Sequence, residues 1–212
     1  MTSPSTMSTT RRALHAVAEV LIAGPQYAAT GDIRLAARPG GFGGVTAGSA
    51  AVAGTDLVTP TGRFPVQGRL IELAERAGIT PRPLRDVYQG GPEFTLDEVL
   101  DVDPAEVGVL LRAFTDGDAA LRRVGPDQEP VLWPEHFDIG ISLDEINFGV
   151  SPGDSSIDLP YAYVGPWNVP SGPFWNQPFG ADRPLSRLLA PQAILAFFRE
   201  GQHLAAEDRV ST

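Results

Sequence analysis

Hydrophobic residues recur at helical spacing in the first part of the chain, which indicates amphipathic helices. One such stripe predicts a helix over residues 10–24, which Pro25 ends. A second stripe predicts a helix over residues 67–77, which stops at Gly78. Residues 1–9 are rich in serine and threonine, so we expect a flexible N-terminal arm before the first helix.

Two further helices are expected in the second half of the chain. Asp103-Pro104 marks a helix start, because an acidic cap precedes a proline at the first helical position. We expect the Asp-Gly-Asp sequence at residues 116–118 to bend or interrupt this helix. The last helix starts at Pro191, and residues 207–212 are expected to form a tail.

Alternation of apolar and polar residues predicts three strands between the first two helices. They cover residues 31–37, 47–53 and 56–60, with a turn at Gly54-Thr55 between the last two. The run Gly40–Gly44 lacks the spacing of a phosphate-binding loop, and a strand rather than a helix is expected after it. We therefore interpret this run as a turn.

The clearest alternation runs through residues 132–143 and predicts one continuous strand. A hairpin turn at Asp144-Glu145 joins it to a second strand over residues 146–150 and pairs Leu143 with Ile146. In this register the apolar residues of both strands share one face, which supports the pairing. The opposite face carries His136, Asp138, Gly140, Ser142, Asn147 and Gly149.

A third strand is expected over residues 160–165, with Tyr161 and Tyr163 on one side. Residues 165–184 then form a long loop that contains Trp167 and Trp175. Long loops of this kind are functional, or their own aromatic side chains pack them onto the core. The sequence leaves open whether this loop is a mobile lid or a fixed wall.

Together these elements predict an α+β fold in which an antiparallel sheet packs against about four helices. The chain has 212 residues, 42% of them hydrophobic, which suffices for a sizeable core without disulfides. We therefore expect a single domain over residues 10–206. The proline-rich segment 81–92 is the one candidate for a weak internal boundary.

Composition excludes several chemistries. The chain has no cysteine and no lysine, and all sixteen of its basic residues are arginine. This removes thiolate metal sites, cysteine nucleophiles, the Schiff-base lysine that pyridoxal phosphate needs, and the lysine of a P-loop nucleotide site. A divalent metal stays open as a cofactor.

The net charge of −10 arises in the second half of the chain. Residues 1–100 carry nine arginines against nine acids, whereas residues 101–212 carry seven against seventeen. Without a basic stripe, neither nucleic acid nor an anionic membrane surface is an expected partner. Thr10-Arg11-Arg12 faintly resembles a twin-arginine export signal, but His15 and Glu19 interrupt the apolar run behind it. We therefore expect a cytoplasmic protein.

Residues 124–182 hold nine carboxylates, all three tryptophans and one histidine, but no arginine. His136 and Asp138 stand two positions apart on the expected strand, so their side chains would share a face about 7 Å apart. This spacing suits two ligands of one metal, or a histidine oriented by a carboxylate. It equally suits a solvated hydrogen-bonded pair. Glu135 is the nearest third ligand, although it would point to the opposite face.

Aromatic side chains near this face could stack on a ligand or hold a cation, or they could simply pack the proline-rich loop. Besides the tyrosines and tryptophans, this group includes Phe174 and Phe179. The predicted ligand-binding residues are His136, Asp138, Asn147, Tyr161, Tyr163, Trp167 and Trp175, and the predicted metal ligands are His136, Asp138 and Glu135. His15 and His203 are interpreted as surface residues on the terminal helices.

Gly149-Val150-Ser151-Pro152-Gly153 matches the G-x-S-x-G motif of serine hydrolases, but we reject this interpretation. The oxyanion hole needs the backbone N–H of the residue after the serine, and Pro152 has none. The motif also needs a helix directly after the serine, where this sequence predicts a turn.

Four segments of the C-terminal part resemble uncharacterised actinobacterial proteins that carry a WPEHFD-type strand. The matching segments are Trp133–Asp138, Asn147–Asp154, Pro160–Trp167 and Phe174–Ala181. The resemblance implies that the acidic stretch is one structural unit. The group has no established activity, so the resemblance assigns no catalytic role.

Three functional hypotheses follow. The first is a protein that binds a small polar or cationic ligand over the acidic, aromatic C-terminal sheet. The second is a metal-dependent enzyme that uses His136 and Asp138, with a third ligand from Glu135, Glu145, Asp154 or a terminal histidine. The third is a non-catalytic interaction protein whose acidic face meets a basic partner. The sequence does not indicate an oligomeric state.

Overall fold

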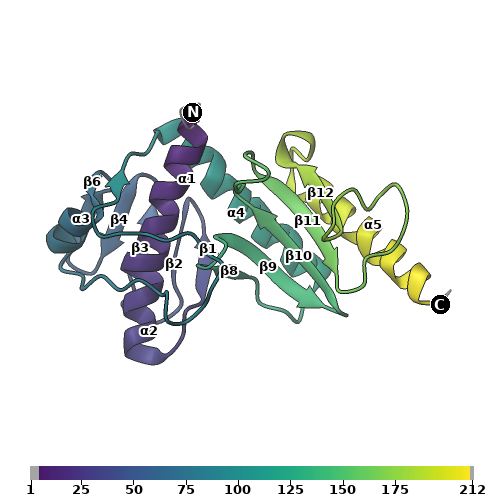
Figure 1. Cartoon of the computed structure of the whole chain (residues 1–212), viewed down its shortest axis with the longest axis horizontal. Coiled ribbons are helices and arrows are strands. Elements are labelled where there is room, and N and C mark those ends of the chain that lie inside the picture. Colours follow the sequence, from purple (N-terminus) through teal and green to yellow (C-terminus); the bar gives the residue numbers. More distant parts are fainter. Residues whose placement is uncertain (1–4, 211–212) are drawn as a thin grey trace. The chain divides into compact units, whose positions relative to one another are not determined.

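The computed structural model describes residues 5–210 as antiparallel strands and helices (Figure 1). The predicted α+β class, with antiparallel pairing and about four helices, is confirmed. The chain forms two compact units. Unit 1 contains the described residues up to Arg112 together with Leu132–Phe137, and unit 2 contains Ala113–Val131 and the described residues from Asp138 onward. Residues 81–92, where a weak boundary was expected, lie within unit 1.

Unit 1 begins with one uninterrupted helical stretch that changes its winding twice. It consists of α1 (Thr6–Ala16), the π-helical segment η1 (Val17–Ala23) and α2 (Gly24–Thr30). The Ser5 side chain caps its first turn, so the helix starts earlier than predicted and includes part of the expected arm. Residues 1–4 of that arm lie outside the described residues.

Pro25 does not end this helix, contrary to the prediction. The Gly24 N–H bonds to the Glu19 carbonyl five residues back, as a π-helix requires. Pro25 then falls in the first turn of α2, where a missing N–H costs little. The stretch ends instead at Gly31, whose φ of 75° is the left-handed conformation of a helix C-cap.

The predicted boundary segment packs onto the π-helical segment. The Arg82 N–H donates to the Val20 carbonyl at 3.0 Å. The Leu84 N–H and the Tyr88 hydroxyl donate to the two carboxylate oxygens of Glu19, at 3.2 and 2.9 Å. Glu19 is 2% exposed, and this burial raises its pKa against the effect of the two donors. The proline-rich segment is thus fixed to the first helix.

The sheet of unit 1 has the strand order β8-β1-β2-β3-β4-β5, and every pair is antiparallel. Its strands are β1 (Leu35–Arg38), β2 (Gly41–Gly44), β3 (Ala51–Ala53), β4 (Asp56–Thr59), β5 (Gly62–Pro65) and β8 (Val131–Trp133). The predicted turn at Gly54-Thr55 is confirmed, because Ala53 pairs with Asp56. A separate small sheet pairs β6 (Gly68–Arg69) with β7 (Val99–Leu100).

The glycine run that was predicted as a turn forms strand β2 instead. Its four residues are buried, and the neighbouring strand approaches them more closely than side chains allow. A Cβ atom on Gly41 would lie 2.0 Å from the Val52 carbonyl oxygen, and one on Gly43 would lie 2.6 Å from the Ala51 side chain. Close packing within the sheet therefore requires these glycines.

Two helices begin and end near the predicted positions. Helix α3 spans Leu70–Ala77 and ends at Gly78, as predicted. Helix α4 spans Pro104–Val124, and the Asp103 carboxylate accepts hydrogen bonds from the first free N–H groups of the helix. The acidic cap predicted from the Asp-Pro pair is thus confirmed.

Helix α4 continues through residues 116–118, so the Asp-Gly-Asp sequence does not interrupt it, which was one of the two predicted effects. In unit 2, Gly117 lies directly against the sheet. A Cβ atom there would be 2.9 Å from the Val150 side chain and 3.2 Å from that of Ile139. This glycine allows close contact between helix and sheet, at a cost to the helix of about 1 kcal/mol relative to alanine.

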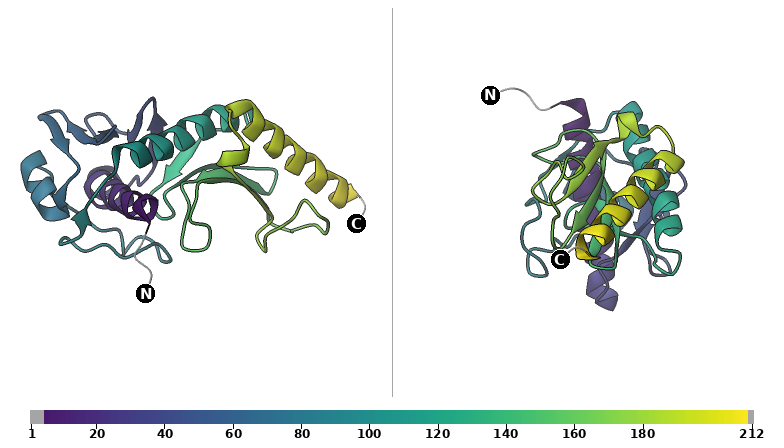
Figure 2. Two further views of the ribbon diagram at one scale, coloured as in Figure 1. Left: turned by 90° about the horizontal axis from the view of Figure 1, so that it is seen from above. Right: turned by 90° about the vertical axis from the view of Figure 1, so that its right-hand side faces the viewer.

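Unit 2 contains a sheet with the strand order β12-β11-β10-β9. Its strands are β9 (Asp138–Leu143), β10 (Ile146–Ser151), β11 (Tyr161–Pro166) and β12 (Ala181–Pro184). A short 3-10 turn, η2 (Leu185–Arg187), follows them. Helix α5 (Pro191–Val210) and the C-terminal part of α4 lie on one side of this sheet (Figure 2).

The hairpin register predicted for β9 and β10 is confirmed. Leu143 pairs with Ile146, and Ile141 pairs with Phe148. The apolar side faces the helices, where Phe148 packs against Phe198 of α5 with ring centroids 5.7 Å apart. The other side of the sheet carries the polar residues, so the alternation assigned the two faces correctly.

We expect that replacing Asp144-Glu145 by Asn-Gly stabilises the protein by about 1 kcal/mol. The two turn residues have φ angles of 50° and 59°, the left-handed conformation that a two-residue hairpin turn requires. Asn and Gly adopt this conformation at lower cost than Asp and Glu. Urea unfolding of both proteins measures the difference. A variant of equal or lower stability would show that the native side chains contribute more than the backbone strain costs.

Candidate functional site

The predicted strand over residues 132–143 is not continuous. Strand β8 ends at Trp133, residues 134–137 form a turn, and β9 begins at Asp138. The Phe137 N–H donates to the Trp133 carbonyl at 2.8 Å, and Phe137 has a φ of 56°. The prediction that His136 and Asp138 share a strand face is therefore wrong, because a turn separates the histidine from the strand.

The packing of Phe137 explains this turn. In unit 1 its ring stacks on His15 at 4.9 Å and meets Phe42 edge-to-face at 5.3 Å. Its ring is buried, and burying an aromatic side chain stabilises by at least as much as one left-handed residue costs. Pro134 also lacks the N–H that a continuing ladder needs.

The predicted metal ligands do not form a ligand set. The His136 side chain is 64% exposed, and its Nε2 atom lies 3.9 Å from Oε1 of Glu135. Within residues 5–210, no group of three or more histidine and acidic side chains is close enough to hold a metal ion. A site needs three or four protein ligands, so the geometry does not support a metal held by Glu135, His136 and Asp138.

His15 is buried, whereas the sequence suggested a surface position. Its Nε2 atom lies 2.6 Å from the Pro134 carbonyl oxygen, which can only accept, so Nε2 carries the proton. Burial lowers the pKa of His15 to about 4, and the hydrogen bond to Pro134 opposes this shift. The ring is thus neutral at pH 7. His203 is exposed, as predicted.

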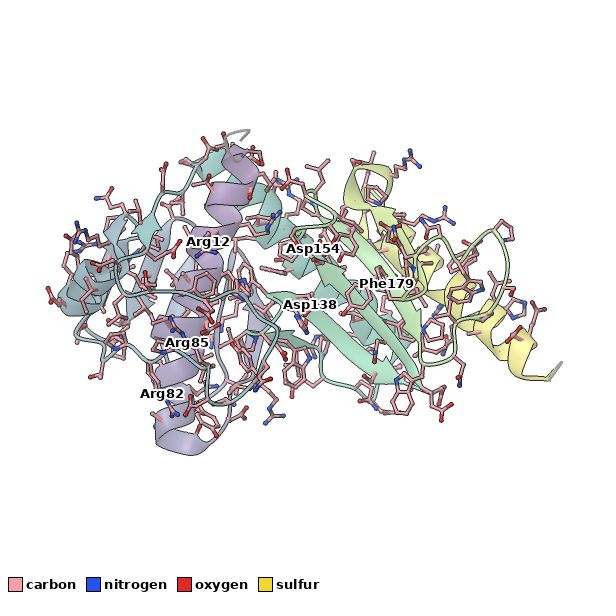
Figure 3. All side chains as sticks on the ribbon, viewed as in Figure 1. Arg12, Arg82, Arg85, Asp138, Asp154 and Phe179 are labelled. Carbon is pink, nitrogen blue, oxygen red and sulfur yellow. The ribbon has the colours of Figure 1, made fainter. Side chains whose placement is uncertain are left out.

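The polar face of the unit 2 sheet is built around a tyrosine–carboxylate pair, whose carboxylate belongs to Asp138 (labelled in Figure 3). Tyr163 of β11 reaches across β10, and its hydroxyl donates to Oδ2 of Asp138 on β9 at 2.5 Å. The ring lies over two glycines. A Cβ atom on Gly149 would be 2.4 Å from it, and one on Gly140 would be 3.2 Å from its hydroxyl. These glycines make room for the bond to Asp138, which is 9% exposed.

A second phenol–carboxylate pair lies beside the first. The Tyr161 hydroxyl donates to Oδ2 of Asp154 at 2.6 Å. The other carboxylate oxygen of Asp154 accepts the backbone N–H groups of Ser156 and Ile157 at 2.6 and 2.8 Å, which holds the loop after β10 in a fixed turn. The Ser151 hydroxyl also bonds to Tyr161. Ser151 therefore belongs to this network, and no helix follows it.

Both phenols keep their protons. Burial raises the pKa of Tyr163 well above its ordinary value, and the nearby charge of Asp138 raises it further. Burial and the bond to Asp154 raise the pKa of Tyr161 in the same direction. Each phenol therefore donates its proton to a carboxylate. The phenol and carboxylate oxygens of this network can form further hydrogen bonds only as acceptors.

Two other predicted residues lie nearer the hairpin turn. Asn147 accepts a hydrogen bond from the Ser142 hydroxyl at 2.7 Å. Trp167 is 67% exposed, and its backbone N–H donates to the Glu145 carbonyl at the turn. Asp138 begins β9 at the end of the strand far from this turn. At the rise of a β-strand, the length of β9 separates Asp138 from the turn by about 17 Å. Trp167 therefore does not cover the two phenols.

Phe179 is the aromatic residue that meets the phenol network. Its ring lies edge-to-face against Tyr163 with centroids 6.4 Å apart. Trp175 instead packs against Phe174, which contacts Phe197 of α5 and so belongs to the helix side. The predicted aromatic wall is thus divided between the two sides of the sheet.

Asp154 is one of several candidates that the sequence offers for a third metal ligand, whereas the structure bonds it to Tyr161, which the sequence did not predict. One signal was available, because Asp154-Ser155-Ser156 is a sequence typical of a side-chain-capped turn. This turn holds the Asp154 carboxylate in the loop that leads to Tyr161. Nothing in the alternation indicated that Gly140 and Gly149 make room for a phenol.

Comparison with known proteins assigns the chain to no family. No family model matches the chain, and neither a curated protein nor a solved structure matches it. The resemblance to actinobacterial proteins with a WPEHFD-type strand stays a prediction. Among the helices of residues 5–210, none combines the length and the hydrophobicity that crossing a membrane requires.

Proposed function

We propose that this protein binds a small cationic ligand, an ammonium or a guanidinium compound, on the polar face of the unit 2 sheet. The observation that carries the proposal is the direction of the two phenol protons. Tyr161 and Tyr163 both donate to carboxylates, so the phenol and carboxylate oxygens can form further hydrogen bonds only as acceptors. A ligand rich in N–H donors complements such a face.

The charge distribution supports a cation. Unit 2 carries thirteen acids against six arginines, and none of those arginines falls between Arg123 and Arg183. The Arg183 guanidinium lies over the rings of Phe174 and Phe197 at 5.6 and 5.3 Å, on the helix side. It therefore does not neutralise the polar face. Phe179 beside Tyr163 adds an aromatic surface of the kind that attracts cations.

The other hypotheses receive less support. No observation favours the metal-dependent enzyme, because the ligands expected for it are not gathered. An acidic face for a basic protein partner remains the alternative, and the experiment below distinguishes it. We also propose that neither nucleic acid nor a membrane is a partner, because the chain is acidic and has no basic stripe. The proposed location is the cytoplasm.

Isothermal titration calorimetry with agmatine, a small guanidinium and ammonium compound, tests the proposal. We expect Asp154→Asn to weaken agmatine binding about tenfold, since it removes one of the two network charges. Asp127→Asn, which neutralises an exposed acid of the same unit outside the network, is the matched control and should bind as the wild type does.

The two variants have the same net charge, so a difference between them reports a site. Equal weakening by both would indicate diffuse attraction to the whole acidic unit, as expected of a surface for a basic partner, and would overturn the proposal. No measurable binding of agmatine to the wild type would overturn it as well.

A further inference from the structure

A hollow of about 650 Å³ lies in unit 2 between the β9–β10 turn and α5. The turn side contributes Asp144, Glu145 and Ile146, and the helix side contributes Arg199, His203 and Ala206. The helix residues recur at the spacing of a single helical face. The volume lies within the range of small-molecule sites, and none of these residues belongs to the phenol network.

Side chains of opposite charge line this hollow. Arg199 forms no ion pair with any residue that the structure describes, although two carboxylates line the same hollow. On the same helix face, the Nε2 atom of His203 lies 3.3 Å from Oε1 of Glu207. Arg199 is therefore the cation that remains available opposite Asp144 and Glu145.

We propose that this hollow binds a small zwitterion with an apolar body, of the type of a free aliphatic α-amino acid. The ammonium group would lie at Asp144 and Glu145, which between them offer several acceptor positions. The carboxylate would pair with the Arg199 guanidinium, whose fork matches carboxylate geometry. The apolar body would cover Ile146 and Ala206.

Three probes of matched shape separate the contributions of the two charges. L-Leucine carries both charges, isoamylamine keeps only the ammonium group, and 4-methylpentanoate keeps only the carboxylate. In a ¹⁵N-resolved NMR titration of the full chain, we expect leucine to shift the amides of residues 144–146 and of α5. Each single-charge probe should bind about tenfold more weakly.

Variants of two exposed arginines in unit 2 provide the matched comparison. Arg199→Gln should reduce leucine to the affinity of isoamylamine, whereas Arg187→Gln, outside the hollow, should bind leucine as the wild type does. Isoamylamine binding as tightly as leucine to the wild type, unchanged leucine binding in Arg199→Gln, or no shift at residues 144–146 would each overturn the proposal. These readouts do not depend on agmatine binding, so they can fail independently of the proposed function.

Discussion

Gly149→Ala is expected to lower the free energy of unfolding by about 3 kcal/mol. The new Cβ atom would lie 2.4 Å from the Tyr163 ring and hydroxyl, which is far inside van der Waals contact. The ring must leave the sheet face, and it cannot do so while keeping its 2.5 Å bond to Asp138. Overpacking and the loss of a donor by a buried carboxylate then add to each other.

Urea unfolding at pH 7 measures this effect, and Gly108→Ala is the control. Gly108 lies in α4, and apart from its own helix turn and chain neighbours no described atom lies within 4 Å of a Cβ atom placed there. Alanine is the better helix former by about 1 kcal/mol, so this variant should be slightly more stable than the wild type. Opposite signs for the two glycines would show that the loss at Gly149 is specific to its contact.

A double-mutant cycle with Tyr163→Ala identifies the cause. Without the ring, the Cβ atom of Gly149→Ala has room, so the second substitution should cost much less than it does in the wild type. If Gly149→Ala costs as much in the Tyr163→Ala background, the phenol does not account for the glycine. The Tyr163 ring would then not lie over Gly149 as described.

The β9–β10 hairpin could be predicted because independent local signals agree. The alternation places Ile141 and Phe148 on one face, and the pairing across Asp144-Glu145 brings those faces together. The caps at Asp103 and Gly78 are equally local, because each depends on one residue type at a helix end. Features of this kind need no knowledge of distant residues.

The site could not be predicted in the same way, because a distant contact decides it. Alternation continues through Phe137, but this residue turns the chain so that its ring can pack between His15 and Phe42. Those partners lie about 100 residues earlier in the chain, and no local pattern points to them. His136 consequently lies in a turn, and Asp138 finds its partner in Tyr163.

The roles of several glycines could not be predicted from the sequence for the same reason. Gly41, Gly117 and Gly149 are each required where another chain segment or side chain comes close, whereas the sequence suggested a turn for the first and a break in a helix for the second. A glycine at a positive φ is a local property, but a glycine at a close approach depends on what approaches. Only the tertiary structure distinguishes the two cases.

His15 is expected to make the protein acid-sensitive. Its pKa is about 4 in the folded protein and about 6.5 in an unfolded chain, because folding buries the ring between Phe94 and Phe137. The folded state therefore binds the extra proton less readily. The contribution of His15 to stability is fully present above pH 6.5 and is lost as the pH falls toward 4. This loss amounts to about 3 kcal/mol at pH 4.

Urea unfolding of His15→Phe at pH 7 and pH 4 isolates this contribution. Phenylalanine keeps the stacking but does not titrate, so the variant should lose about 3 kcal/mol less than the wild type between the two pH values. The variant starts from a lower stability at pH 7, because the Pro134 carbonyl loses its donor. The comparison therefore uses the change with pH and not the absolute values.

His203→Gln is the matched control, because it removes an exposed histidine and leaves the buried His15 in place. The carboxylates that titrate in the same range are common to all three proteins, so their effect cancels in the comparison. An equal loss of stability in His15→Phe and the wild type would mean that the His15 ring is solvated in the folded protein. In that case the ring of Phe137 would not pack against a buried His15. The turn that separates His136 from Asp138 would then need another cause.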